Sequence, residues 1–358
     1  MKTRFLKLWL AAPIAILVLM NAAAAQSIST SLASLPDADV LIYMSPQRIL
    51  NDAAPRVMSA KELTEMRASF ADIKKSAGFD PSTVEYLVIA LRFHKPAGDL
   101  SFVAPDVMAV VGGDFSAESL LSVAQLALQD KVRIEKHGAK SIALMRVDPI
   151  AEQAAKTPLL KSLSEIGAVS LSGNSIAFGN LAYLKSAIDA AEGTGRINPA
   201  TLESLLRDPN VLVASAGAPL ASFAKAFGMF GTQTTPRDGT CNTAFGNFYS
   251  AITISGTNFN IRGAMNADNP DTAKIITNLL EGLMQQGINA VPDKEAQSIL
   301  QTIKMTPKEN EIVWEADVPE QFVADIFKPK PATVDVKITT PPRRPVRKKR
   351  TTQKGKGE

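Results

Sequence analysis

Pro36-Asp37-Ala38-Asp39-Val40-Leu41-Ile42 decides how this chain is organised, because a similar phrase returns as Arg207-Asp208-Pro209-Asn210-Val211-Leu212-Val213. In each copy, turn-forming residues lead into a short aliphatic run, and a proline follows at Pro46 or Pro219. This pattern predicts a turn, a short buried strand and the start of a helix. Two copies of the pattern predict that the chain is internally repeated.

The segments that follow the two copies also correspond in order. Each half contains two expected strands, then an aspartate, then an amphipathic helix that begins directly after a capping side chain. The expected strands are 84–91 and 108–113 in the first half, and 249–255 and 260–267 in the second. The aspartates are Asp114 and Asp268, and the capping residues are Ser116 and Asn269.

Each half is expected to close with a hairpin and a helix. The closing hairpins are 169–178 and 303–314, with helices from about residues 182 and 319. The first half is longer because it carries an additional hairpin at 132–147, turning at His137-Gly138, and a helix near 149–165. Alternating apolar and polar residues in these hairpins indicate antiparallel sheets with one face in water.

The predicted fold class is therefore α+β, with two related repeats of antiparallel sheet and helices packed on one face. The expected segments are a signal peptide at 1–25, a leader at 26–33, repeats at 34–200 and 201–327, and a disordered basic tail at 328–358. With 46% hydrophobic residues the chain can bury a large core, and its only cysteine, Cys241, allows no intramolecular disulfide.

Residues 1–25 have the composition of a secretory signal peptide. Three basic residues precede an apolar run at 8–20, and Ala23 and Ala25 provide small side chains before Gln26. The run is shorter than the roughly 20 residues that a helix needs to cross a bilayer. We expect cleavage before Gln26 and a mature protein in the periplasm or cell envelope. An uncleaved membrane anchor is the alternative.

Charge divides the chain into an acidic body and a basic tail. The whole chain carries +4, of which residues 1–25 contribute +3 and the tail +9, so residues 26–327 carry −8. Prolines and the lack of an apolar face predict that the tail is disordered. For an exported chain the available polyanions are lipid headgroups or wall polymer rather than nucleic acid. The predicted contacts are Arg343, Arg344, Arg347, Lys348, Lys349 and Arg350. A solubilising extension without a partner is the alternative.

The sequence contains no recognisable catalytic or metal-binding motif. The two histidines, His94 and His137, are interpreted as solvated turn residues, since neither belongs to a local zinc or triad pattern. Ser222-Phe223-Ala224-Lys225 has the Ser-x-x-Lys spacing, but the Lys-Ser/Thr-Gly element that accompanies it is absent, so we interpret the segment as an ordinary amphipathic helix. Asp114 and Asp268 are expected to stabilise helix N-termini, with a shared cation as the alternative. We expect no catalytic residue, cofactor or metal.

Aromatic residues gather around one polar segment, 231–244. Aromatics are scarce elsewhere, and a long polar segment between them is typical of a binding loop. The predicted binding lip for a hydrophobic or aromatic ligand consists of Phe227, Phe230, Phe245, Phe248 and Tyr249. The alternative is that these side chains belong to the core.

The phrase Tyr183-Leu184-Lys185-Ser186-Ala187-Ile188-Asp189-Ala190-Ala191, a break at Gly193 and Gly195, and a run from Leu202 into Val213 resemble a known family. It is the family of exported bacterial proteins that carry domain of unknown function 3352. The resemblance implies export and a repeated α+β body, and no assigned activity. The sequence thus predicts a non-enzymatic envelope protein with a binding or scaffold role. An envelope hydrolase, or another enzyme with its site between the repeats, is the alternative.

Overall fold

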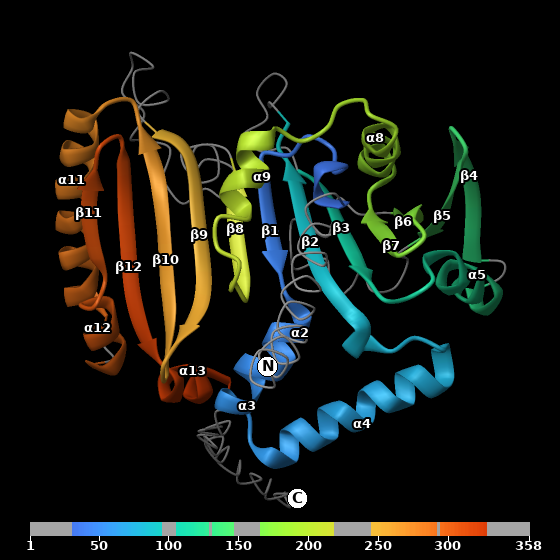
Figure 1. Ribbon diagram of the computed structural model, residues 1–358, viewed down its shortest axis with the longest axis horizontal. Coiled ribbons are helices and arrows are strands. Elements are labelled where there is room, and N and C mark those ends of the chain that lie inside the picture. Colours follow the sequence, from blue (N-terminus) through green and yellow to red (C-terminus); the bar gives the residue numbers. More distant parts are fainter. Residues whose placement is uncertain are drawn as a thin grey trace, which may run out of the picture.

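The computed structural model describes residues 31–94, 105–128, 131–146, 165–217, 245–291 and 294–327. These residues form one twelve-stranded sheet with helices along it (Figure 1). The strands are β1 (Val40–Met44), β2 (Val84–Arg92), β3 (Asp106–Gly113), β4 (Val132–His137), β5 (Lys140–Arg146), β6 (Glu165–Ser172), β7 (Ser175–Gly179), β8 (Val213–Gly217), β9 (Phe245–Ser255), β10 (Asn258–Ala267), β11 (Lys304–Lys308) and β12 (Glu311–Pro319). The helices are α2 (Pro46–Arg48), the π-turn η1 (Ile49–Ala53), α3 (Ala54–Val57), α4 (Ala60–Ala77), the 3-10 turn η2 (Pro81–Thr83), α5 (Ala117–Leu128), α8 (Leu181–Ala191), α9 (Pro199–Leu205), α11 (Pro270–Ala290), α12 (Lys294–Leu300) and α13 (Glu320–Phe327).

The two halves of the chain share this one sheet. Its strand order is β11-β12-β10-β9-β8-β1-β2-β3-β7-β6-β5-β4, and the paired strands are antiparallel, as predicted. The halves join where β1 pairs with β8, with Leu41 opposite Ala216 and Tyr43 opposite Ala214. Nothing in the local patterns predicted this joint, because it links residues far apart in the chain.

Local predictions of helices and turns are confirmed where the structure describes them. The Asn269 side chain accepts a hydrogen bond from the Thr272 N–H at 2.8 Å and caps α11, and Ser116 does the same for Ser119 at 3.3 Å ahead of α5. The additional hairpin is β4–β5, and its turn residue Gly138 has a φ of 56°. The helix expected near 149–165 and the segment after Pro219 lie outside the described residues.

Helices pack on both faces of the sheet, so the prediction of one covered face was wrong. Strand β9 shows the reason, because it is apolar on both sides. Tyr249 and Ala251 face one cluster, to which α8 and α9 contribute. Phe248 packs against α11, and Ile252 and Ile254 pack against a cluster that includes α13. We call these two sides the α8 face and the α11 face.

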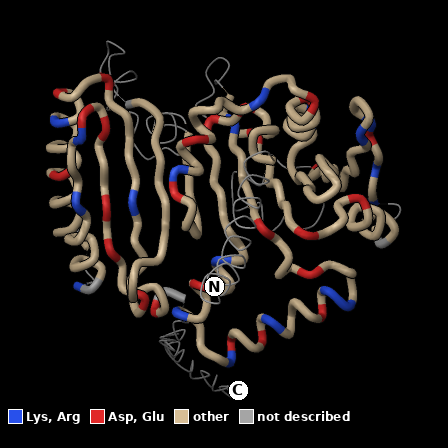
Figure 2. The backbone as a smooth tube through the Cα atoms, viewed as in Figure 1, with Lys and Arg blue, Asp and Glu red and all other residues tan. Residues whose placement is uncertain are grey.

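Helix α4 is held differently from the other long helices. It leaves the sheet and runs along one end of it (Figure 1), and none of its residues is buried. A reciprocal pair of hydrogen bonds between Ser59 and Glu62 starts it, and Gly78, with a φ of 68°, ends it. Lys or Arg and Asp or Glu follow one another along its length (Figure 2). No helix in the described parts of the chain is long and apolar enough to cross a membrane.

Candidate ligand-binding site

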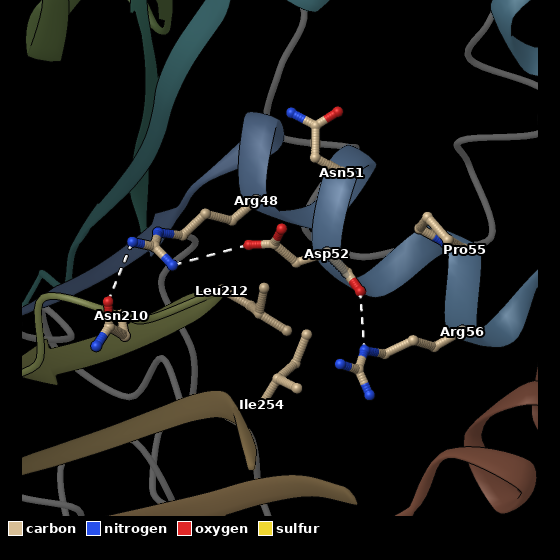
Figure 3. Close-up of a pocket in the computed structure, with 8 residues that line it drawn as sticks. All are labelled: Arg48, Asn51, Asp52, Pro55, Arg56, Asn210, Leu212 and Ile254. Carbon is tan, nitrogen blue, oxygen red and sulfur yellow. Dashed lines mark hydrogen bonds and ion pairs between the residues drawn. The ribbon is translucent and has the colours of Figure 1, made fainter. Parts of the chain in front are cut away.

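A hollow of about 540 Å³ lies where the first helical segments meet the ends of the central strands (Figure 3). Ligand pockets of small molecules typically measure about 300–1,000 Å³. Its lining consists of Arg48, Asn51, Asp52, Pro55, Arg56, Asn210, Leu212 and Ile254. Leu212 and Ile254 lie between the helical segments and the strands and form an apolar floor, whereas two arginines, the Asp52 carboxylate and amide groups surround it. The hollow can thus hold a molecule with one polar and one apolar end.

Three consecutive helical turns position the charged side chains. Segments α2, η1 and α3 run without a break from Pro46 to Val57. Within them, Asp52 follows Arg48 by four residues, and Arg56 follows Asp52 by four. Residues with this spacing lie on the same side of a helix. The middle turn is a π-turn, a geometry that occurs frequently at functional sites.

The side chain of Arg56 links three segments of the structure. Its Nε donates to the Asp52 carbonyl oxygen at 3.1 Å, and its Nη1 donates to the Gly256 carbonyl oxygen at 2.7 Å. Nη1 also lies 3.3 Å from the carboxylate of Glu320 on α13. These contacts connect α3 to the β9–β10 turn and to α13. Arg56 is therefore a positioning residue at the rim of the hollow.

Arg48 is held more loosely. Its Nη2 donates to Asn210 Oδ1 at 3.1 Å, and its Nη1 lies 3.8 Å from the carboxylate of Asp52. Since both side chains are more than two-fifths exposed, this ion pair contributes at most about 1 kcal/mol. A guanidinium has five N–H donors, and the contacts to described residues use two of them, so within this part of the chain Arg48 retains donors for an anionic group that enters the hollow.

The turn ahead of β8 carries the polar partner of Arg48. The side chain of Asp208 is only 4% exposed, and it accepts hydrogen bonds from the Asn210 N–H at 3.1 Å and from Arg262 Nη2. Asp208 thereby fixes the turn from which Asn210 reaches Arg48. Asp208 and Asn210 both belong to the repeated phrase. The sequence predicted a turn at these residues but carried no signal that Asn210 lines a hollow.

The predicted aromatic lip is only partly described. Phe248 and Tyr249 are neighbours on β9, so they point to opposite faces of the sheet and are not brought together. Phe248 packs beside α11, and Tyr249 is only 6% exposed in the core on the α8 face. The side chain of Phe245 is not described, and Phe227 and Phe230 lie outside the described residues.

Other predicted segments also lie outside the described residues. They are residues 1–30, Ser222 to Lys225, Cys241 and the tail with Arg343, Arg344, Arg347, Lys348, Lys349 and Arg350. The end of the predicted leader is described, and there Leu32 is fully buried in the core. Residues 31–33 are therefore part of the folded body.

Each histidine lies beside a turn or loop, partly exposed, and also contacts an aspartate that its interpretation as a solvated turn residue did not include. His94 Nε2 lies 2.9 Å from Asp106 Oδ2, and His137 Nε2 lies 2.7 Å from Asp189 Oδ1. Burial would raise the pKa of Asp106, but hydrogen bonds from Arg92 and Asn180 outweigh burial and lower it. Both aspartates come from other elements, and local sequence patterns carry no signal for such pairs.

Metal ligands do not gather in the described parts of the chain, where no group of three or more His, Cys, Asp or Glu side chains could hold an ion. Asp114 and Asp268 are exposed, and the helices that follow them, α5 and α11, lie at opposite ends of the sheet (Figure 1). A cation shared between these two aspartates is therefore not supported.

Comparisons with known proteins leave the family open. Searches against family models and against curated proteins found no match. Among solved structures, crystal forms I, III and IV of TP0453 align with a TM-score of 0.42 each, at 12%, 11% and 10% identity. The alignments cover 82% of this chain and 95%, 96% and 95% of the TP0453 chains. A likeness at this score carries no argument about fold or function.

Proposed function

We propose that this chain is an exported, non-enzymatic binding protein of the bacterial envelope, which holds a small amphipathic anion beside Arg48. One observation carries the proposal, namely an arginine with unused donors above the apolar floor of Leu212 and Ile254. A carboxylate would accept hydrogen bonds from Arg48, and its apolar chain would lie on the floor. Each buried CH₂ group then contributes about 0.8 kcal/mol.

Two related repeats, at 34–200 and 201–327, are part of this proposal. Outward from the β1–β8 joint, the strand order is β1, β2, β3, β7, β6 on one side and β8, β9, β10, β12, β11 on the other. The two orders agree element by element, and α5 and α11 follow β3 and β10 in the same way. The hollow takes Arg48 from the first half and Asn210 from the second, so it lies between the proposed repeats.

Export and the role of the tail rest on the sequence. The basic and apolar pattern of residues 1–25 and the resemblance to the domain of unknown function 3352 family support an envelope location. There, the +9 tail would attach the −8 body to lipid headgroups or wall polymer. Each Lys or Arg near an anionic membrane contributes about 1 kcal/mol.

An envelope enzyme with its site between the repeats is the alternative. The hollow does lie between the two halves, but its described lining offers no serine, cysteine or histidine that would act as nucleophile or general base. The two His–Asp pairs involve other residues, and no hydroxyl or thiol among the described residues has a hydrogen bond to either imidazole. Binding is therefore the function that this geometry supports best.

Calorimetry on the chain from Gln26 to Glu358 tests the binding proposal. Hexanoate should bind, while hexanol and hexylamine, which have the same chain without the anion, should bind about tenfold more weakly or less. Arg48→Gln should weaken hexanoate about tenfold, since hydrogen bonds to a charged group contribute about 1.5–3 kcal/mol. Arg67→Gln on the exposed helix α4 is the matched control. Equal affinity for hexanoate and hexanol, or no effect of Arg48→Gln, would contradict the proposal.

Cosedimentation with vesicles tests the tail. The full mature chain should bind anionic vesicles and not neutral ones, and a form that ends at Phe327 should lose this binding. At 1 M salt the screening length falls to about 3 Å, so the binding should disappear. Equal binding by the shortened form would show that the tail is only a solvated extension.

A further inference from the structure

A second hollow, of about 320 Å³, lies on the other side of the turn at residues 207–212. It opens on the α8 face of strands β9, β10 and β12, where the Tyr249 side chain lies. Its lining consists of Arg207, Asp208, Tyr249, Arg262, Gly263, Ala264, Val313, Trp314 and Glu315. None of these residues lines the hollow beside Arg48, so the two hollows offer a ligand different side chains, although the Asp208 carboxylate also supports the turn that carries Asn210.

Tyr249 has a buried hydroxyl that the described residues do not satisfy. The residue is 6% exposed, and its hydroxyl has no hydrogen-bond partner among the described residues. Buried polar groups are paired in the large majority of cases. Burial raises the pKa of Tyr249, and the positive charge of Arg207 opposes this only in part. The hydroxyl therefore keeps its proton at neutral pH and can donate it to an acceptor.

Arg207 is the charged group in this hollow that is free to move. Its guanidinium carbon lies 5.8 Å from the centre of the Tyr249 ring, and its side chain is 51% exposed. Apart from the ring, the polar contact of its side chain with the described residues is one to Glu311, at 3.5 Å. Such an exposed pair contributes about 1 kcal/mol at most, so Arg207 can swing away from the ring and admit a ligand.

The other charged groups of the hollow already have hydrogen-bond partners. Arg262 donates to the buried carboxylate of Asp208, and Glu315 accepts from Asn260 Nδ2 at 2.9 Å. These two carboxylates border the hollow and would repel a dianion such as phosphate about twice as strongly as a monoanion. A ligand with a single negative charge is therefore favoured.

Small apolar side chains form the floor. Tyr249 lies opposite Ala264 on β10, and Ala264 lies opposite Val313 on β12. Ala264 is 5% exposed, and the ring of Trp314 covers Gly263 from the α11 face, where it packs beside α11. Above Ala264 and Val313, next to the Tyr249 ring, there is space for a compact apolar group rather than a long chain.

We infer that this hollow is a second binding site, for a compact monocarboxylate. One carboxylate oxygen accepts a hydrogen bond from the Tyr249 hydroxyl, and the other accepts from the guanidinium of Arg207. The apolar part of the ligand lies on Ala264 and Val313. This inference does not rest on the function proposed for the hollow beside Arg48.

Titration of the mature chain with benzoate, followed by calorimetry, tests the inference. Benzamide has the same shape without the charge and should bind about tenfold more weakly or less. Tyr249→Phe removes the hydroxyl alone and should weaken benzoate about tenfold, as should Arg207→Gln, because each removes a hydrogen bond to a charged group. Arg67→Gln on α4 should leave benzoate binding unchanged.

Three outcomes would overturn the inference. They are equal affinity for benzoate and benzamide, unchanged benzoate binding in Tyr249→Phe, and loss of benzoate binding in Arg48→Gln, which would assign benzoate to the first hollow. Circular dichroism establishes that each variant is folded. Should Arg207→Gln not fold, Arg207→Met replaces it, and the same loss of about tenfold is expected because the charged donor is again removed. Failure of hexanoate to bind beside Arg48 leaves this test unaffected.

Discussion

Strand β1 and helix α4 belong to the same half of the chain, yet the β1–β8 joint and helix α4 are held by different forces. At the joint, Leu41 is fully buried and the strands pair along their whole length. Helix α4 buries no residue, and its two ends are secured by local hydrogen bonds. Tertiary burial therefore stabilises the centre of the molecule, whereas α4 depends on the local interactions of its own sequence. Four pairs of matched substitutions test this distinction.

The largest difference is expected between Leu41→Ala and Ile73→Ala. Leu41 is fully buried, so its truncation should lower the free energy of unfolding by about 2–5 kcal/mol. Ile73 on α4 is 39% exposed, and its truncation should change stability by about 0.5 kcal/mol or less. Urea denaturation measures both values. Similar losses in the two variants would show that α4 is packed after all.

Two glycines give the next comparison. A methyl group on Gly217 at the joint would lie 2.1 Å from the Asp39 carbonyl oxygen, so Gly217→Ala forces the backbones of β1 and β8 apart. We expect a loss of about 1–3 kcal/mol. Gly78 ends α4 with a φ of 68° and faces open space, so Gly78→Ala should cost about 1 kcal/mol through backbone strain alone. Thermal unfolding ranks the two variants, and a larger loss for Gly78→Ala would reverse the comparison.

Helix caps distinguish local from global stability. Ser59→Ala on α4 and Asn269→Ala on α11 each remove a capping hydrogen bond, which contributes about 1 kcal/mol. Because α11 packs on the sheet, its variant should lower global stability. The α4 variant should increase amide hydrogen exchange within Ala60–Ala77 while global unfolding stays nearly unchanged. Equal global losses would contradict the independence of α4.

The smallest effects are expected from two aspartates with lowered pKa. Hydrogen bonds from Arg92 and Asn180 lower the pKa of Asp106 against the effect of burial, and the hydroxyl of Ser82, helped by Lys74 of α4, lowers that of Asp80. A carboxyl with a lowered folded-state pKa adds stability above its unfolded pKa of about 3.9, and this stability is lost as pH falls through the folded-state pKa.

Unfolding measured from about pH 6 down to pH 2 checks this sign. Asp106→Asn should remove part of the acid dependence of global stability, because Asp106 lies at the start of β3 within the sheet. Asp80→Asn should affect mainly the end of α4. A stability that rises toward acid pH in the parent protein would be the opposite of what these directions require.

Several local features of the fold could be predicted from sequence because their causes are local. Capping side chains marked the starts of α5 and α11, and the glycine turn marked the β4–β5 hairpin. The site could not be predicted in the same way. Arg48 follows the first copy of the repeated phrase, and Asn210 belongs to the second. The pairing of β1 with β8 brings the two residues together, so that Arg48 Nη2 lies 3.1 Å from Asn210 Oδ1.

The two copies of the repeated phrase show where sequence ends and tertiary structure begins. Turn chemistry and aliphatic runs act over a few residues, so the sequence alone predicts that each copy contains a turn that leads to a strand, although β8 begins at Val213, two positions later in its copy than β1 in the first. What the turn residues contact depends on the tertiary structure. Asp39 accepts a hydrogen bond from the Phe93 N–H at 2.6 Å, whereas Asn210, at the matching position, accepts from Arg48. Such partners depend on which strands become neighbours, and neighbouring strands are selected by burial over the whole chain.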